Sequence, residues 1–69
     1  MKPSARNQLK GKVVAIEKGA VNAIVKIDIG SAVITSSITN TAVEELGLEV
    51  GKTAYAVVKA SNVMVGVDD

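Results

Sequence analysis

Cysteine, histidine, tryptophan and phenylalanine are absent from this sequence of 69 residues, and Tyr55 is its one aromatic residue. Without cysteine and histidine the chain has no disulfide framework, no zinc ribbon, no thiol nucleophile and no imidazole base. Proteins that bind single-stranded nucleic acid need aromatic stacking platforms and a positive groove. One tyrosine and a net charge of +1 supply neither, so we expect no nucleic-acid partner.

Long hydrophobic runs are also missing. The stretch from Met1 to Arg6 is polar and leads into no apolar core of a signal peptide. Later apolar runs are broken by Lys, Asp, Ser or Gly well before the roughly 18 residues that a membrane span needs. The sequence therefore predicts a cytoplasmic protein without a membrane partner.

Aliphatic residues dominate what is present, with 48% of the chain hydrophobic. We expect one domain over residues 1–69. A domain this short buries only about 60% of its unfolded-chain surface and is marginally stable alone. Because no disulfide or metal ligand can reinforce it, the surplus apolar surface predicts that copies of the chain share it in a homo-oligomer.

Valine and isoleucine favour strands because their branched side chains suit a pleated surface. One predicted strand alternates clearly: Val25, Ile27 and Ile29 point one way, while Lys26 and Asp28 point the other. Strands are predicted for residues 8–17, 22–29, 31–38, 53–59 and 62–67.

A short helix is predicted between the third and fourth strands. Thr41 fits an N-cap with Glu44 at position N3, and Gly47 fits the position after the helix end. The order predicts an all-β fold, a five-stranded OB-like Greek-key barrel with one short helix between strands 3 and 4. An SH3-like barrel, or two meanders swapped between subunits, would fit the same order.

Catalytic chemistry has little to build on. Lys59 and Ser61 could form a Ser–Lys pair, but no third group that would orient them is apparent, so we expect no enzyme. The polar residues are mostly hydroxyls, amides and isolated cations. Such donors suit a small, fully deprotonated oxyanion, which offers only acceptor oxygens. Polar residues at strand ends are more often simply solvated or helix-capping groups, and that interpretation stays open here.

The chain opens with Ser4-Ala5-Arg6-Asn7-Gln8-Leu9-Lys10-Gly11, which strongly resembles the start of the molbindins, the small molybdate-binding Mop proteins. The resemblance covers essentially the whole chain. It continues at Gly19-Ala20-Val21-Asn22-Ala23, Ile38-Thr39, Leu46-Gly47-Leu48, Gly51-Lys52 and Val58-Lys59-Ala60-Ser61-Asn62-Val63.

The resemblance implies an OB-like fold and a homohexamer, arranged as a trimer of dimers, that binds molybdate or tungstate at its subunit interfaces. It implies no organic cofactor and no metal ion held directly by protein side chains. The implied oxyanion site consists of Ser4, Arg6, Thr39, Lys59 and Ala60. A second oxyanion site is implied at the turn of Gly19, Ala20, Val21 and Asn22.

In these sites Arg6 and Lys59 would compensate the charge of the dianion, while Ser4, Thr39 and backbone N–H groups would orient it. The turn could present its N–H groups as an anion nest. The residues also have simpler interpretations, as a surface arginine, a solvated lysine, a helix-leading threonine and a plain hairpin turn. The implied function is intracellular molybdenum storage or homeostasis. The alternative is an anion-sensing interaction module that acts on a partner protein.

Overall fold

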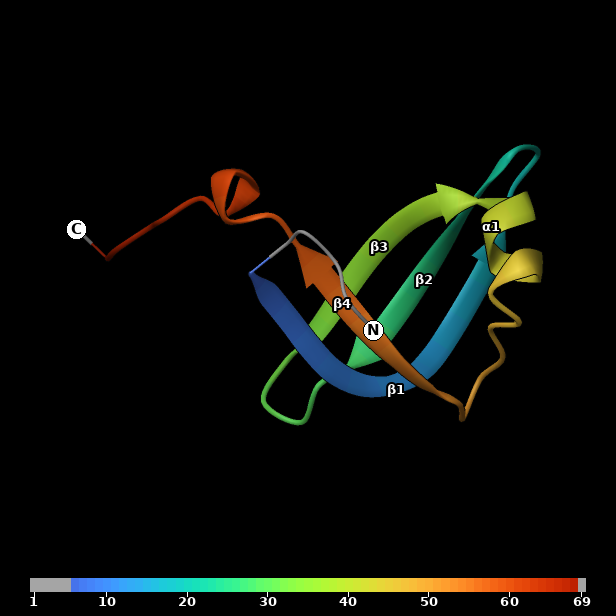
Figure 1. Cartoon of the computed structure of the whole chain (residues 1–69), viewed down its shortest axis with the longest axis horizontal. Coiled ribbons are helices and arrows are strands. Elements are labelled where there is room, and N and C mark those ends of the chain that lie inside the picture. Colours follow the sequence, from blue (N-terminus) through green and yellow to red (C-terminus); the bar gives the residue numbers. More distant parts are fainter. Residues whose placement is uncertain (1–5, 69) are drawn as a thin grey trace.

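The structure is a computed structural model that describes residues 6–68, and it shows a curled antiparallel sheet with one short helix at its end (Figure 1). The strands are ordered β3-β2-β1-β4. The elements are β1 (Asn7–Lys18), β2 (Asn22–Asp28), β3 (Val33–Thr39), α1 (Asn40–Glu45), β4 (Thr53–Val58) and the 3-10 turn η1 (Ala60–Asn62). The expected mostly-β architecture, with a helix between the third and fourth strands, is confirmed.

Strand β1 is long and bent, and it pairs with two other strands. Its first half pairs with β4, from Asn7 opposite Val58, and its second half pairs with β2 as far as Lys18. Gly11 lies where the two pairings meet. A Cβ atom there would collide with the carbonyl oxygen of Asp28 and lie 2.8 Å from Cγ2 of Ile27. Only glycine therefore allows this close approach of β1 to β2.

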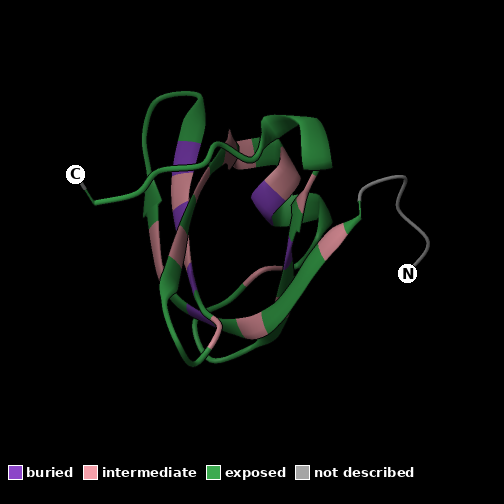
Figure 2. Ribbon diagram, turned by 90° about the vertical axis from the view of Figure 1, so that its left-hand side faces the viewer, coloured by how far each residue is buried: buried purple, intermediate pink, exposed green. Residues whose placement is uncertain are grey.

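The core forms where the inward faces of the strands meet α1. Val13 and Val25 are 0% and 1% exposed, and Val43 brings the helix onto the same cluster. The buried residues fall on β1, β2, β4 and α1, around one common interior (Figure 2). The alternation predicted for β2 is confirmed, because Val25 and Ile27 are buried while Asp28 is exposed.

The N-cap of α1 is Thr39, and the prediction of Thr41 was wrong. Thr39 has extended backbone angles, and its side-chain oxygen accepts a hydrogen bond from the N–H of Ala42 at 3.0 Å. The helix end was predicted correctly. Gly47 has φ of +62°, its N–H donates to Glu44, and the N–H of Leu48 donates to the Val43 carbonyl. These two bonds form a Schellman motif.

The fifth predicted strand is not a strand in this structure. Residues 60–62 form η1, and residues 63–68 continue without regular secondary structure. A strand needs a neighbouring edge to pair with, and the 3-10 turn directs this segment away from the sheet (Figure 1). Four strands are therefore present among residues 6–68. No helix in that range has the length and apolar character needed to cross a bilayer.

Candidate functional site

Two of the predicted site residues, Arg6 and Lys59, lie at the same end of the sheet. Arg6 directly precedes β1 and Lys59 directly follows β4, and these strands pair there through Asn7 and Val58. Both cations are exposed. Within the described residues the ion pairs are Lys18–Glu44 and Lys52–Glu49, and neither Arg6 nor Lys59 takes part in one. Positive charge is therefore uncompensated at this end of the described chain.

Backbone donors accompany that charge at η1. Lys59 precedes the turn with extended backbone angles and gives it no side-chain cap. The N–H groups of Asn62 and Val63 donate to the carbonyls of Lys59 and Ala60. The N–H groups of Ala60 and Ser61 reach no acceptor within residues 6–68, as expected for the first turn of a helix. Ala60 thus offers the N–H group that the predicted site requires.

Thr39 lies elsewhere in the chain. It ends β3, pairs with Asn22 and caps α1. In Figure 1, α1 and η1 lie at opposite ends of the sheet. The structure of one copy therefore brings Thr39 together with the second predicted site, and it separates Thr39 from Arg6 and Lys59. Ser4, the remaining member of the first site, lies outside the described residues.

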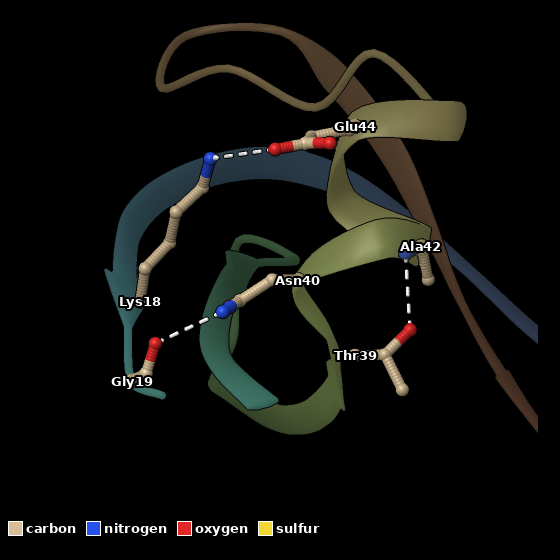
Figure 3. A network of polar contacts seen from close by, with 6 residues as sticks. All are labelled: Lys18, Gly19, Thr39, Asn40, Ala42 and Glu44. Carbon is tan, nitrogen blue, oxygen red and sulfur yellow. Dashed lines mark hydrogen bonds and ion pairs between the residues drawn. The ribbon is translucent and has the colours of Figure 1, made fainter. Parts of the chain in front are cut away.

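The turn of the second predicted site is held from two sides. Across the turn, the N–H of Gly19 donates to the Asn22 carbonyl at 2.8 Å. Asn40 donates from its side-chain Nδ2 to the Gly19 carbonyl at 2.9 Å (Figure 3). Its backbone N–H donates to the Val21 carbonyl at 2.8 Å. The carbonyl groups of Gly19, Val21 and Asn22 thus accept hydrogen bonds within the chain. The N–H groups of Ala20 and Val21 reach no acceptor within the described part of the chain.

Asn40 is the residue that the sequence interpretation missed as a functional candidate. No motif or spacing in the sequence connects it with Gly19. Its Oδ1 atom is buried without a hydrogen-bond partner among residues 6–68. The one local signal for its role is the position of an asparagine directly after the N-cap, since a side chain there can form hydrogen bonds with groups outside the helix.

The surroundings of the turn favour a ligand that accepts hydrogen bonds. The oxygen of Thr39 accepts from Ala42, which leaves its hydroxyl proton free to donate. Lys18 and Glu44 form an exposed ion pair of 3.7 Å that links the end of β1 to α1 (Figure 3). No group of three His, Cys, Asp or Glu side chains that could hold a metal ion occurs among residues 6–68.

Comparison with known proteins identifies the family of this chain. The family model of the TOBE domain matches residues 3–65. A probable molybdenum-pterin-binding protein of Haemophilus influenzae is 67% identical over 69 residues, covering 99% of this chain and 100% of the relative. Among solved structures, MopII from Clostridium pasteurianum is 49% identical with a TM-score of 0.89, over 96% of this chain and 100% of MopII.

A further solved structure is that of ModG, described as a cytoplasmic molybdate-binding protein and solved with molybdate bound. It is 52% identical with a TM-score of 0.92, and the match covers 99% of this chain and 49% of the ModG chain. The resemblance found in the opening Ser4–Gly11 motif is therefore confirmed. The chain belongs to the TOBE domain family and, within it, to the small molybdenum-pterin-binding Mop proteins.

Proposed function

We propose that this protein binds molybdate, and also tungstate, at the subunit interfaces of a cytoplasmic homohexamer arranged as a trimer of dimers. Its role is molybdenum storage or homeostasis, and the whole chain, residues 1–69, acts as one binding domain without catalytic activity. The names of its relatives support molybdate as the ligand, since they include molybdenum-pterin-binding and molybdate-binding proteins. The two oxyanions share charge and shape, so the same donors serve both.

The observation that carries the proposal is the division of the first site within one copy. Arg6, Lys59 and Ala60 gather at one end of the sheet, and Thr39 lies at the other. A site that uses all four residues therefore needs donors from two copies. Binding the anion then stabilises the assembly that creates the site.

The donor set matches the chemistry of a tetrahedral dianion. The anion offers only acceptor oxygens, and hydrogen bonds from charged donors are roughly twice as strong as those between neutral groups. Arg6 and Lys59 supply the compensating positive charge. Thr39, Ser4 and the N–H of Ala60 supply neutral donors that fix the anion's orientation. No carboxylate forms an ion pair with either cation in the described chain, so the anion has no competitor there.

The second site is the turn Gly19–Asn22, where the N–H groups of Ala20 and Val21 point to no acceptor of the described chain. Such N–H groups can bind an anion as a nest. Both residues are exposed, and Val21 is 69% exposed. An anion bound by this turn would therefore need further donors, which symmetry-related copies of the same turn would provide.

Native mass spectrometry tests the proposal directly. The anion-free protein should appear as a hexamer and should gain discrete masses with molybdate or tungstate, but none with equimolar sulfate. Arg6→Ala and Lys59→Ala should each weaken molybdate binding and keep the hexamer. Lys26→Ala, which removes a lysine from the middle of β2, is the charge-matched control and should bind normally. Unchanged affinity in both site variants would remove these residues from the site.

A further inference from the structure

The side chain of Asn40 bonds far from its own helix. Asn40 follows the N-cap Thr39 and begins α1, yet its amide reaches the turn between β1 and β2 (Figure 3). Its Nδ2 donates to the Gly19 carbonyl at 2.9 Å, and the two residues are 21 positions apart in the chain. A side chain of α1 therefore holds the backbone of the second predicted site from outside the turn.

The amide of Asn40 is only half satisfied. Its Oδ1 atom is buried and has no hydrogen-bond partner among residues 6–68. Turning the amide over would not relieve this, because Oδ1 would then face the carbonyl oxygen of Gly19. A buried acceptor without a partner lowers the stability of a protein, so its presence in a native structure calls for an explanation. An apolar side chain such as leucine would avoid that cost, so the role of the asparagine lies in the bond that its Nδ2 makes.

The carbonyl of Gly19 has no backbone donor in the described chain. In a closed β-turn, the N–H of the fourth residue donates to the carbonyl of the first, which here would join Asn22 to Gly19. Among residues 6–68 the bond runs only the other way, from the N–H of Gly19 to the carbonyl of Asn22. The Asn40 side chain takes the place of the missing donor. It therefore sets the orientation of the peptide group that joins Gly19 to Ala20.

That orientation decides where the N–H of Ala20 points. The peptide group is planar and trans, so its C=O and N–H bonds point in opposite directions. Because the Gly19 carbonyl points toward Asn40, the N–H of Ala20 points away from it. Ala20 is exposed, and its N–H reaches no acceptor within residues 6–68. This donor is therefore directed outward before any ligand arrives.

We propose that Asn40 is the positioning residue of the second oxyanion site. Its Nδ2 fixes the carbonyl of Gly19 and its backbone N–H fixes that of Val21, so the turn presents its N–H groups in one arrangement. A free peptide group at Gly19 would also present its carbonyl oxygen outward, and that oxygen repels an oxyanion. Donors that are ordered in advance bind more tightly, because binding no longer has to order them. Asn40 acts through the turn and does not contact the anion.

This inference rests on the second site of the proposed function and concerns that site alone. The side-chain hydrogen bond of Asn40 goes to the turn and not to a residue of the first site. The N–H groups of Ala20 and Val21 belong to the second site, and the N–H of Ala60 belongs to the first. Each site therefore has backbone amides of its own, so binding at the two sites can be followed separately in one protein.

The test follows these three amides by NMR while molybdate is added to the full chain. In the wild type the signals of Ala20, Val21 and Ala60 should all shift and saturate. In Asn40→Leu the signals of Ala20 and Val21 should need roughly 10-fold or more molybdate, since a hydrogen bond to a charged ligand loses its alignment. The signal of Ala60 should titrate as in the wild type. Thr41→Leu is the matched control, since Thr41 is the next residue of α1 and is exposed, and all three amides should titrate normally in it.

A second variant covers the case in which the leucine variant does not fold. In Asn40→Ser the side chain is too short to reach the Gly19 carbonyl but stays small and polar, and the same selective loss is expected. Wild-type titration of Ala20 and Val21 in these variants would overturn the positioning role and leave the second site standing. Equal weakening at Ala60 would also overturn it, because the effect would not be local. If Ala20 and Val21 do not shift even in the wild type, the second site itself is wrong and the role of Asn40 falls with it.

Discussion

Thr39 caps α1 and, in the proposed function, also binds the anion, and substitution can separate these two roles. Its side-chain oxygen accepts the Ala42 N–H at 3.0 Å and so caps α1. In the proposed function, its hydroxyl proton is donated to the oxyanion. Serine keeps both the acceptor and the proton, and alanine removes both. Aspartate keeps an acceptor for the cap but has no proton to donate, and it adds a negative charge that repels the anion.

The magnitudes follow from these contacts. Losing the cap in Thr39→Ala should lower the free energy of unfolding by about 1 kcal/mol. Losing a hydrogen bond to a charged ligand costs about 1.5–3 kcal/mol, so molybdate should bind roughly 10- to 150-fold more weakly. Thr39→Asp should be as stable as the wild type, because aspartate is a good N-cap and favours the helix dipole. Its molybdate affinity should fall at least as far as that of the alanine variant.

Urea denaturation at a fixed protomer concentration measures the free energy of unfolding, and isothermal titration with molybdate measures the affinity for the anion. The protomer concentration must be held constant because the stability of an oligomer depends on it. Thr39→Ser is the control and should match the wild type in both assays. If Thr39→Asp binds molybdate with wild-type affinity, Thr39 is no ligand. If Thr39→Ala unfolds at the wild-type urea concentration, the cap contributes nothing.

Three further substitutions test the packing around the sites. Gly11→Ala should lower the free energy of unfolding by about 1–3 kcal/mol in urea, since its new Cβ meets a backbone carbonyl of β2 that cannot move alone; a variant as stable as the wild type would contradict this close approach. Asn40→Ala should lower the free energy of unfolding by about 0.5–1.5 kcal/mol, because it removes the hydrogen bond to the Gly19 carbonyl. The amide NMR shifts of this variant should change mainly at Gly19 and its turn, and changes spread evenly over the sheet would count against a local role. Lys18→Ala removes the exposed ion pair with Glu44 and should change the free energy of unfolding by less than about 1 kcal/mol. This change should vanish in 1 M salt, because salt screens exposed charges.

Much of the fold could be predicted because its signals are local. The alternation of Val25 and Ile27 identifies β2, and Gly47 marks the end of α1. The N-cap was missed because Thr39 and Thr41 both lie near the start of the helix and only Thr41 has a glutamate three residues later. What favours Thr39 is the contact of Asn40 with Gly19, which lies across the sheet and leaves no local signal.

The fifth strand was missed for a different reason. Residues 62–67 have strand-forming composition, but a strand also requires an edge, and η1 turns this segment away from the edges of its own chain. Composition gives the strand propensity of a segment, but it does not show whether an edge is available to that segment.

The candidate sites depended almost wholly on the family resemblance. Arg6 and Lys59 become neighbours only through the register of Asn7 opposite Val58, and Thr39 joins the turn only through its pairing with Asn22. A single sequence carries no direct signal for such pairings between distant segments. Residue types were compatible with an anion and the family resemblance implied one, but the structure was needed to show which donors one copy can bring together.

The division of β1 between two partners also orders the folding of the chain. β2 joins its second half through a short turn and β3 joins β2 through another, whereas β4 follows β1 by more than 30 residues of chain before it pairs with the first half. Closing that long loop costs more conformational entropy than closing the turns, so we expect the pairing of β1 with β4 to form late in folding. Arg6 and Lys59 meet only in this closing step. A chain that stalls earlier thus lacks the paired cations, so on the proposed function only molecules that complete folding should take up the anion.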